Sequence, residues 1–313
     1  MLTRKPMPDK KQPSFSVRQG CATDLPVVAQ ICSDVYGGSD YIPEMWEEWT
    51  ASPQNMGFIV EMDGQSVGLY LLRLNVAGSD TGWIQGVRVA TAFKKQGVAR
   101  FILEHAIRQS RELSLNFIQY ATAQDNLPMH RLAGLYGFWH VGNFLNYNYV
   151  RGQVSPHGNA RASRLVTTSE FDEAYRLLLE SPEHQLGHGI YCNTWNWKPL
   201  NMDTFRQHLE RREVYCLTGA LKVLAILCRA ENDSHWIAFL AGDTASKLPL
   251  LHELARKVTK NILPDQQFEF TAQLIQTPAN EALLKQAGFE PDNHEPIMSL
   301  YELNLHTDRP TAR

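Results

Sequence analysis

A turn between an apolar run and an amphipathic helix carries the residues with the clearest chemistry in this 313-residue chain. The helix that starts near Gly97 leaves its first backbone N–H groups without partners. These groups, together with the positive end of the helix dipole, attract an anion. Gly97 and Ala99 are small where the anion must approach closely, and positive charge comes from Lys94, Lys95 and Arg100. We therefore expect the turn to bind a polyanion such as a pyrophosphate.

The alternative is a solvated turn that happens to carry lysines. Two phosphate-binding motifs, the GxGxxG of dinucleotide-binding folds and the GxxxxGK of P-loops, are both absent from it. The local pattern alone leaves both interpretations open, so the neighbouring elements must decide between them.

Those elements alternate between strands and helices. Asp63 and Gly64 between two apolar runs are a strong hairpin signal. Periodicity and capping signals predict strands at 14–19, 56–62, 65–74, 82–90, 116–123 and 138–150, and helices that begin near residues 24, 43, 97 and 127. The predicted order is β, α, α, β, β, β, α, β, α, β.

The second half of the chain partly repeats the first. Residues 233–258 resemble 81–110, and residues 268–289 resemble 117–138. A polar stretch without periodicity, residues 151–163, is typical of a linker. We therefore predict a duplicated domain, with a disordered arm at 1–13, a catalytic domain at 14–152 and a degenerate copy at 164–305.

The turn, read as Lys94, Lys95, Gln96, Gly97, Val98, Ala99, resembles motif A of the GNAT acetyltransferases, Q/R-x-x-G-x-G/A after a strand. Asn126, eleven residues before Gly137 of a GF pair, also matches the family pattern. The resemblance implies an α/β (α+β) fold with a mixed central sheet flanked by helices, and acetyl-CoA as cosubstrate. It implies that Asn126 contacts the pantetheine arm. The other cofactor-binding residues that it implies are Val87, Arg88, Val89, Lys94, Lys95, Gln96, Gly97, Val98, Ala99 and Arg100.

Two positions depart from the family pattern. Ala133 stands where many members carry a tyrosine that protonates the leaving thiolate, and the nearest tyrosine is Tyr136. Gln85 stands where a glutamate is often proposed as general base, and an amide cannot take a proton at neutral pH. We therefore name Tyr136 and Asp40 as catalytic candidates, while a water chain could also take the proton of an α-amine.

The stretch DVYGGSDYIPEMWEEW resembles the corresponding part of histidine N-acetyltransferases and their relatives, which carry a second, degenerate domain. The resemblance implies that the acceptor is a small primary amine, and it favours a free amino acid, with histidine as the first candidate. The acceptor-site candidates are Tyr36, Asp40, Tyr41, Glu44 and Gln85. Asp40 could equally cap a helix that starts at Pro43. Two other functions stay open: a tandem acetyltransferase of a glycosidic amine resembling mycothiol synthase, and a non-catalytic CoA-binding regulator.

Composition narrows the class of partner. A formal charge of -3 and a pI near 6.4 give no overall basic field, so we expect no nucleic-acid partner. The five cysteines are widely spaced and form no CxxC pair, which disfavours a disulfide framework or a metal site. The sequence shows no secretory signal and no membrane-spanning run, so we expect a cytoplasmic protein. It leaves the oligomeric state open.

Overall fold

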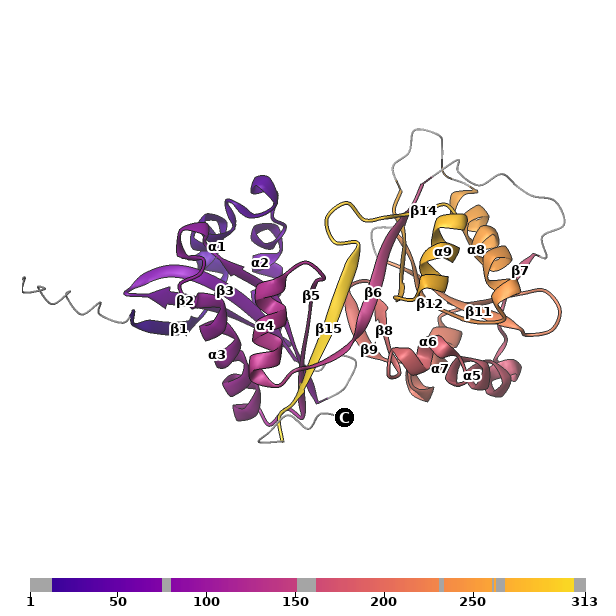
Figure 1. The fold of residues 1–313 in the computed structure, drawn as a ribbon, viewed down its shortest axis with the longest axis horizontal. Coiled ribbons are helices and arrows are strands. Elements are labelled where there is room, and N and C mark those ends of the chain that lie inside the picture. The colour runs from indigo at the N-terminus through magenta and orange to yellow at the C-terminus, as the bar shows by residue number, and fades with distance from the viewer. Residues whose placement is uncertain are drawn as a thin grey trace, which may run out of the picture. The chain divides into compact units, whose positions relative to one another are not determined.

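The chain forms two compact units (Figure 1). The structure, a computed structural model, describes residues 13–74, 80–150, 162–230, 234–260, 262 and 268–306. Unit 1 comprises Met1–Tyr120 with Leu303–Arg309, and unit 2 comprises Ala121–Glu302 with Pro310–Arg313. These limits follow contacts, whereas the predicted ranges 14–152 and 164–305 follow the repeated sequence. Most of the predicted arm and of the predicted linker lies outside the described residues.

Unit 1 contains the elements predicted for the first part of the chain. In chain order they are β1 (Phe15–Gln19), η1 (Ala22–Asp24), α1 (Leu25–Cys32), η2 (Val35–Gly38), α2 (Ile42–Ala51), β2 (Asn55–Met62), β3 (Gln65–Arg73), β4 (Thr81–Val89), η4 (Thr91–Phe93), α3 (Val98–Glu112) and the start of β5 (Phe117–Ala123).

A mixed sheet in the order β1-β2-β3-β4-β5 forms the middle of unit 1. Successive pairs are antiparallel except β4 and β5, which are parallel. On β3, Leu69 packs with Trp46 and the rest of the α1–α2 cluster. At the adjacent Gly68, a side chain would instead meet Val98 and Ile102 of α3. Helices therefore cover both faces, as continuous apolar runs in the strands require.

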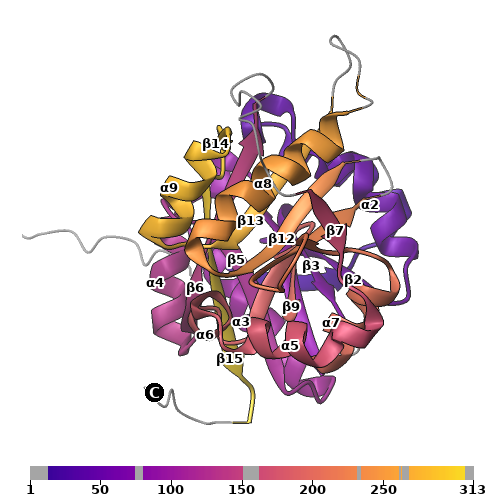
Figure 2. The same ribbon diagram turned by 90° about the vertical axis from the view of Figure 1, so that its right-hand side faces the viewer.

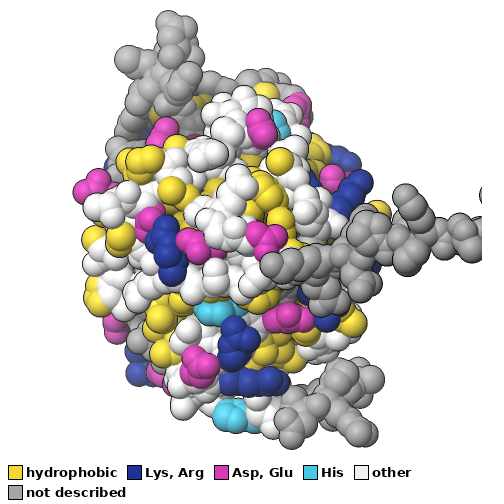
Figure 3. All heavy atoms as spheres, turned by 90° about the vertical axis from the view of Figure 1, so that its left-hand side faces the viewer, with side chains coloured by type: hydrophobic (Ala, Val, Ile, Leu, Met, Phe, Trp, Pro, Cys, Tyr) yellow, Lys and Arg dark blue, Asp and Glu magenta, His cyan; other side chains and the backbone are white. Residues whose placement is uncertain are grey.

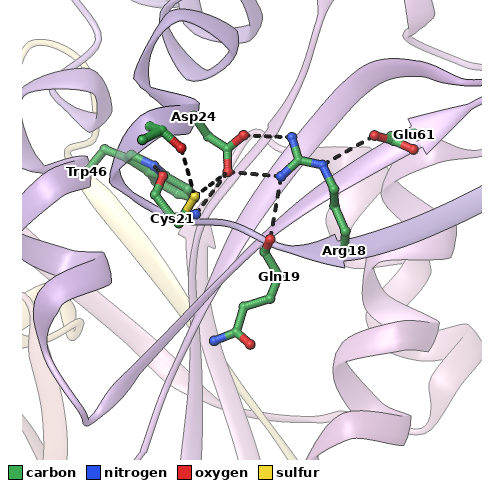
Figure 4. Close-up of polar contacts among 7 residues, drawn as sticks. Arg18, Gln19, Cys21, Asp24, Trp46 and Glu61 are labelled. Atoms are coloured by element: carbon green, nitrogen blue, oxygen red, sulfur yellow. Dashed lines mark hydrogen bonds and ion pairs between the residues drawn. The ribbon is translucent and has the colours of Figure 1, made fainter.

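An arginine on β1 fixes the start of the helical layer (Figure 4). Arg18 donates hydrogen bonds to both carboxylate oxygens of Asp24, at 2.7 and 2.9 Å, and another to Glu61 at 3.3 Å. Asp24 also accepts the backbone N–H of Cys21 at 2.9 Å, which completes a capping box. The Arg18 hydrogen bonds lower the pKa of Asp24 to about 2. Trp46 Nε1 donates to the Cys21 carbonyl at 2.9 Å and so attaches α2 to the same turn.

Unit 2 contains the remaining elements, and β5 ends within it. They are α4 (Leu127–Tyr136), β6 (Trp139–Tyr149), β7 (Ser163–Leu165), η5 (Thr168–Glu170), α5 (Phe171–Leu179), α6 (Pro182–Leu186), β8 (Ile190–Asn193), β9 (Asn196–Pro199), α7 (Met202–Glu210), β10 (Val214–Leu217), β11 (Val223–Arg229), β12 (His235–Gly242), α8 (Thr244–Thr259), β13 (Phe270–Ile275), α9 (Pro278–Gln286), β14 (Phe289–Pro291) and most of β15 (Ile297–Asn304).

The strands of unit 2 form a mixed sheet in the order β15-β6-β13-β12-β11-β10-β7. Helices α8 and α9 lie on one face and α5 and α7 on the other (Figure 2). Ile237 of β12 packs with Leu254 of α8 in one buried cluster. Its neighbour Ala238 packs with Phe205 of α7 in another. This is the layered arrangement of unit 1.

Unit 2 also repeats the arginine–carboxylate pair of unit 1. Arg164 of β7 donates to both carboxylate oxygens of Glu170, at 2.6 and 2.8 Å, with the same six-residue spacing as Arg18 and Asp24. Glu170 accepts the N–H of Thr167 at 2.9 Å in an equivalent capping box. The Arg164 hydrogen bonds lower the pKa of Glu170 to about 2. The two units thus share this local feature as well as the layered plan, as the predicted duplication requires.

The surface carries mixed charge. On the face drawn in Figure 3, basic and acidic side chains are interspersed among polar and apolar ones rather than gathered in one patch. Within the described residues, no helix is both long and apolar enough to cross a membrane.

Candidate functional site

The second half of β4 leaves its parallel neighbour. Pairing between β4 and β5 covers residues 81–83 and 117–119. Beyond it, the side chains at residues 85–89 change from buried to half-buried. Backbone N–H and C=O groups outside a ladder need another partner. Residues 85–89 therefore offer a strand edge to an extended ligand that carries amides.

A β-bulge interrupts the same segment. Leu69 of β3 pairs with Arg88 and Leu71 pairs with Gln85, so two residues of β4, Gly86 and Val87, lie opposite one residue of β3. Gly86 has a φ of 62°, and a side chain there would approach Ile42 Cδ1 within 3.2 Å. A bulge frees a backbone group from the ladder and is often found beside an active site.

The turn before α3 has the geometry of an anion site. Gly97, its N-cap, has a φ of 91° in the left-handed region, and Lys95 has a φ of 64°. An added Cβ at Gly97 would meet nothing within 4 Å. The first helical bond is donated by Phe101 N to Gly97 O at 3.0 Å, so the N–H groups between them have no acceptor within the helix. The start of α3 is thus open, with exposed lysines beside it.

Three predicted cofactor residues have partners within unit 1. The Val98 side chain is buried against β3, so its backbone N–H is the group that can face a ligand. Gln96 Nε2 donates to the Ala92 carbonyl at 2.9 Å and braces the turn. Arg100 Nε donates to Glu104 at 3.0 Å on the exposed surface of α3. An exposed pair of this kind contributes less than about 1 kcal/mol and can be exchanged for a ligand contact.

Asp40 is held by Arg88 and by the start of α2. Its carboxylate accepts hydrogen bonds from Arg88 Nε at 2.6 Å and Arg88 Nη2 at 3.1 Å. Its Oδ1 also accepts the N–H of Ile42 at 3.3 Å, which supports the alternative that Asp40 holds the start of α2. The Asp40 side chain is only 1% exposed. The structure thus shows the Asp40 carboxylate in an ion pair with Arg88, and its catalytic role stays a prediction.

The other acceptor candidates lie nearby on α2 and β4 or on the loop before α2. Tyr41 is half-exposed, with its ring edge-on to Trp49 at 5.9 Å and the Arg88 guanidinium carbon 5.8 Å from the ring centre. Gln85 is half-buried on β4, and Glu44 is exposed in the first turn of α2. Tyr36 belongs to η2, but its side chain lies outside the described part of the chain. The candidates Asp40, Tyr41 and Arg88 are therefore brought together.

Comparison with known families and proteins bears on this geometry. The model of the acetyltransferase (GNAT) family matches residues 26–138. Residues 26–138 belong to the GNAT family. This stretch includes β4, the open turn before α3 and the predicted acceptor loop. A curated relative, the histidine N-acetyltransferase of Xenopus tropicalis, is 30% identical over 81 residues, which cover 26% of this chain and 25% of the relative.

Solved structures extend the GNAT likeness to both units. A GCN5-related N-acetyltransferase from Sphaerobacter thermophilus matches with a TM-score of 0.62 at 14% identity, over 98% of this chain and 100% of that chain. A GCN5-related glucosamine N-acetyltransferase region of a fungal multi-domain β-N-acetylglucosaminidase matches with a TM-score of 0.60 at 11% identity, over 94% of this chain and 38% of that chain. At these identities the likeness shows the fold alone, which is a tandem GNAT fold.

Two further candidate site residues, Asn126 and Tyr136, lie in unit 2. Asn126 is the N-cap of α4: its side chain accepts the Met129 N–H at 3.5 Å and donates to Thr122 Oγ1 at 2.9 Å. Tyr136 is the last residue of α4 and is half-buried, while Ala133 is fully buried. The predicted contact of Asn126 with pantetheine and the catalytic role of Tyr136 stay predictions.

The second unit has the same backbone features, but other elements of the chain lie against its separated strands. β12 and β13 pair in parallel over residues 235–237 and 270–272 only, and β12 carries an extra residue, Ala238, opposite β11. Strand β8 and helix α6 contact both strands beyond the paired part. The remaining cavity, lined by Glu183, Tyr191 and Leu274 among others, has a volume of only about 10 Å³, room for about one water.

Side chains also occupy the start of α8, the counterpart of the open turn. Asp243 accepts the Ala245 N–H at 3.4 Å and the Ser246 hydroxyl at 2.8 Å. Lys247, in the first turn, reaches Glu183 of α6 at 2.5 Å in a buried ion pair. The acidic cap is consistent with the predicted degeneracy of this copy, since a carboxylate at the helix start would repel a phosphate.

Two features of the site escaped sequence reasoning. The bulge depends on register between strands, although a glycine inside an apolar strand, Gly86, was an available signal. The ion pair between Asp40 and Arg88 joins residues 48 positions apart and had no local signal.

Proposed function

We propose that the GNAT domain of this chain transfers the acetyl group of acetyl-CoA to the primary amine of a small molecule, with a free amino acid such as histidine as the first candidate. The observation that carries the proposal is the arrangement of residues 85–100. A strand edge beyond the β4–β5 ladder, a bulge and a helix start without a side-chain cap follow one another there along the chain.

The cosubstrate would be held mainly by backbone groups. The edge of β4 at Val87 and Val89 would pair with the amides of the pantetheine arm. The N–H groups of Val98 and Ala99, with Lys94 and Lys95 beside them, would hold the pyrophosphate. The fit is supported by the free space at Gly97, where no protein atom lies within 4 Å of an added Cβ.

The chemistry requires a neutral amine beside the thioester. The amine nitrogen forms a bond to the carbonyl carbon, the carbon–sulfur bond breaks, and the thiolate takes a proton. Gln85 cannot accept the amine proton, and Asp40 is held by Arg88. An α-amine with a pKa near about 8 loses its proton readily to water, so we assign proton removal to water and most of the acceleration to positioning. Tyr136 stays our candidate for protonating the thiolate.

The acceptor assignment has two supports. One is the stretch of 30% identity to a histidine N-acetyltransferase. The other is the grouping of Arg88, Asp40 and Tyr41, which offers a guanidinium and an aromatic face to a small zwitterion. A glycosidic amine acceptor of the mycothiol synthase type is less well supported, because it implies an active second copy, whose cleft is filled.

The direct test is thiol release from acetyl-CoA, followed with DTNB, across amino acids, polyamines and glucosamine. The proposal predicts turnover with amino acids, histidine foremost, and the N-acetylated product by mass spectrometry. Turnover with glucosamine alone would support the amino-sugar alternative. Tight CoA binding without turnover of any amine would support the non-catalytic regulator.

A further inference from the structure

Three metal-type donor atoms converge inside unit 2. They are His208 Nδ1, a carboxylate oxygen of Glu213 and Cys228 Sγ, and all lie within 4.8 Å of one another. His208 Nδ1 lies 2.5 Å from Glu213 Oε2. The Cys228 sulfur lies 3.9 Å from the same nitrogen and 3.8 Å from the same oxygen. No sequence motif predicts this cluster, because 20 positions separate His208 from Cys228 and no CxxC pair is present.

The backbone places each donor. His208 lies in the last turn of α7 and Cys228 lies near the end of β11. Glu213 is held between them: its N–H donates to the His208 carbonyl at 2.9 Å, and its carbonyl accepts the Leu227 N–H at 2.8 Å. The turn before Glu213 runs through Arg212 with a φ of 61°, a conformation that non-glycine residues rarely adopt. Such strained residues are often found where a ligand clamp is held in place.

The geometry differs from that of a nucleophilic triad. In a Cys–His–Glu triad the thiol and the carboxylate face opposite nitrogens of the imidazole. Here both face Nδ1, and the Tyr191 hydroxyl lies 2.5 Å from Nε2. Donors that converge on one nitrogen, with the far nitrogen fixed by a second side chain, are typical of a histidine that binds a metal.

The spacing suits zinc. Tetrahedral Zn²⁺ with bonds of about 2.0 Å to nitrogen and oxygen and about 2.3 Å to sulfur needs its sulfur roughly 3.5 Å from the other donors. The observed 3.8 and 3.9 Å are close to that value. The His208–Glu213 contact must open by less than about 1 Å, since the two atoms now lie at hydrogen-bond distance. The Glu213 side chain is 18% exposed and gives the cluster a route to solvent.

We propose that His208, Glu213 and Cys228 form a zinc site that joins α7, β10 and β11 of unit 2, with Tyr191 orienting His208. The fourth position would be taken by water. Because these elements belong to the copy with the filled cleft, the metal would serve its stability rather than catalysis.

Cobalt substitution tests the site through its thiolate. The intact protein, treated with chelator, dialysed and titrated with Co²⁺, should bind one equivalent and show thiolate-to-cobalt charge-transfer absorption in the near ultraviolet. Zn²⁺ should then displace the cobalt and remove the band. Cys228→Ser should abolish the band, whereas Cys216→Ser, an equally buried thiol of the same core cluster, should keep it. Circular dichroism of each variant checks the fold.

Two milder variants keep the test decisive if Cys228→Ser does not fold. Glu213→Gln should weaken Co²⁺ binding more than about 100-fold, and Tyr191→Phe by about 10 to 100-fold as an outer-shell change. A protein that binds no stoichiometric Co²⁺ or Zn²⁺ would overturn the site and leave a hydrogen-bonded cluster only. A band that survives Cys228→Ser and disappears in Cys216→Ser would overturn the ligand assignment.

Discussion

The two units of this chain share one backbone plan and differ in what occupies it. In each, a parallel strand pair separates after three residues and one of the strands carries a bulge. In unit 1 the helix that follows begins at Gly97, with free space beside it. In unit 2 it begins at Asp243, whose carboxylate caps the helix. The comparison teaches that two units with the same backbone plan can differ in whether protein side chains occupy the start of the helix.

In unit 2, elements of the protein itself contact the separated strands. Strand β8 and helix α6 lie against the separated strands, and Glu183 of α6 meets Lys247 where a cofactor phosphate would need a free cation. The apolar edges of separated strands need cover from water. In unit 2, elements of its own chain provide that cover.

The largest effect should follow from breaking the buried pair of unit 2. Lys247→Met leaves Glu183 uncompensated in a site where its Oε2 already lacks a hydrogen-bond partner. We expect the free energy of unfolding to fall by about 3 to 5 kcal/mol, measured by urea denaturation. Combining Lys247→Met with Glu183→Leu should recover most of the loss. A single variant with unchanged stability would show that the pair does not close the cleft.

The next largest effect should follow from closing the cleft of unit 1. Gly97→Glu places charge and bulk at the start of α3 and should weaken acetyl-CoA binding by at least about 100-fold, or about 2.7 kcal/mol, by calorimetry. Gly97→Ala separates backbone strain from charge and should cost less. Gly134→Glu, an exposed glycine on α4 with open space around it, is the matched control and should leave affinity unchanged. Equal affinity for wild type and Gly97→Glu would contradict the proposed pyrophosphate site at the start of α3.

A smaller effect is expected at the Asp40–Arg88 pair, which distinguishes positioning from proton transfer. Asp40→Asn keeps the shape of the side chain and removes its charge. We expect kcat/KM to fall about tenfold, well short of the roughly 100 to 10,000-fold loss of a general base. The pH profile of kcat/KM should keep its form, because water rather than Asp40 takes the proton. Loss of an ionisation step in the variant would restore Asp40 as the base.

The smallest effect on stability should be equal in the two units, because each has the same arginine–carboxylate pair beside a capping box. Arg18→Gln and Arg164→Gln should each lower the free energy of unfolding by about 1 kcal/mol at neutral pH, since both arginines are partly exposed. The folded-state pKa values of Asp24 and Glu170 are lowered to about 2, so this stability is present above their ordinary values of 3.8 and 4.5 and is lost as the pH falls towards 2. Unfolding measured from pH 6 to 2.5 should therefore depend less on pH in both variants. A marked difference between the two would break the equivalence of the units.

The sequence predicted the repeated pattern better than the contacts that distinguish the copies. Apolar periodicity and caps predicted the order of strands and helices, because each signal lies within one element. Gly97 was likewise a local signal for the open start of α3, because a glycine N-cap can be recognised within a single turn. The Asp40–Arg88 pair and the His208 cluster could not be predicted, because each joins residues that only the tertiary fold brings together. The unit limits also depend on long-range pairing: β6 pairs with β13 and β15, which come far later in the chain.

The central claim is that one of two similar clefts binds the cosubstrate. Its most direct test is the stoichiometry of acetyl-CoA binding to the wild-type chain by isothermal titration calorimetry. The account predicts one molecule per chain, and none detectable in Gly97→Glu. Two molecules per chain, or one that persists in Gly97→Glu, would contradict the assignment of the open cleft to unit 1.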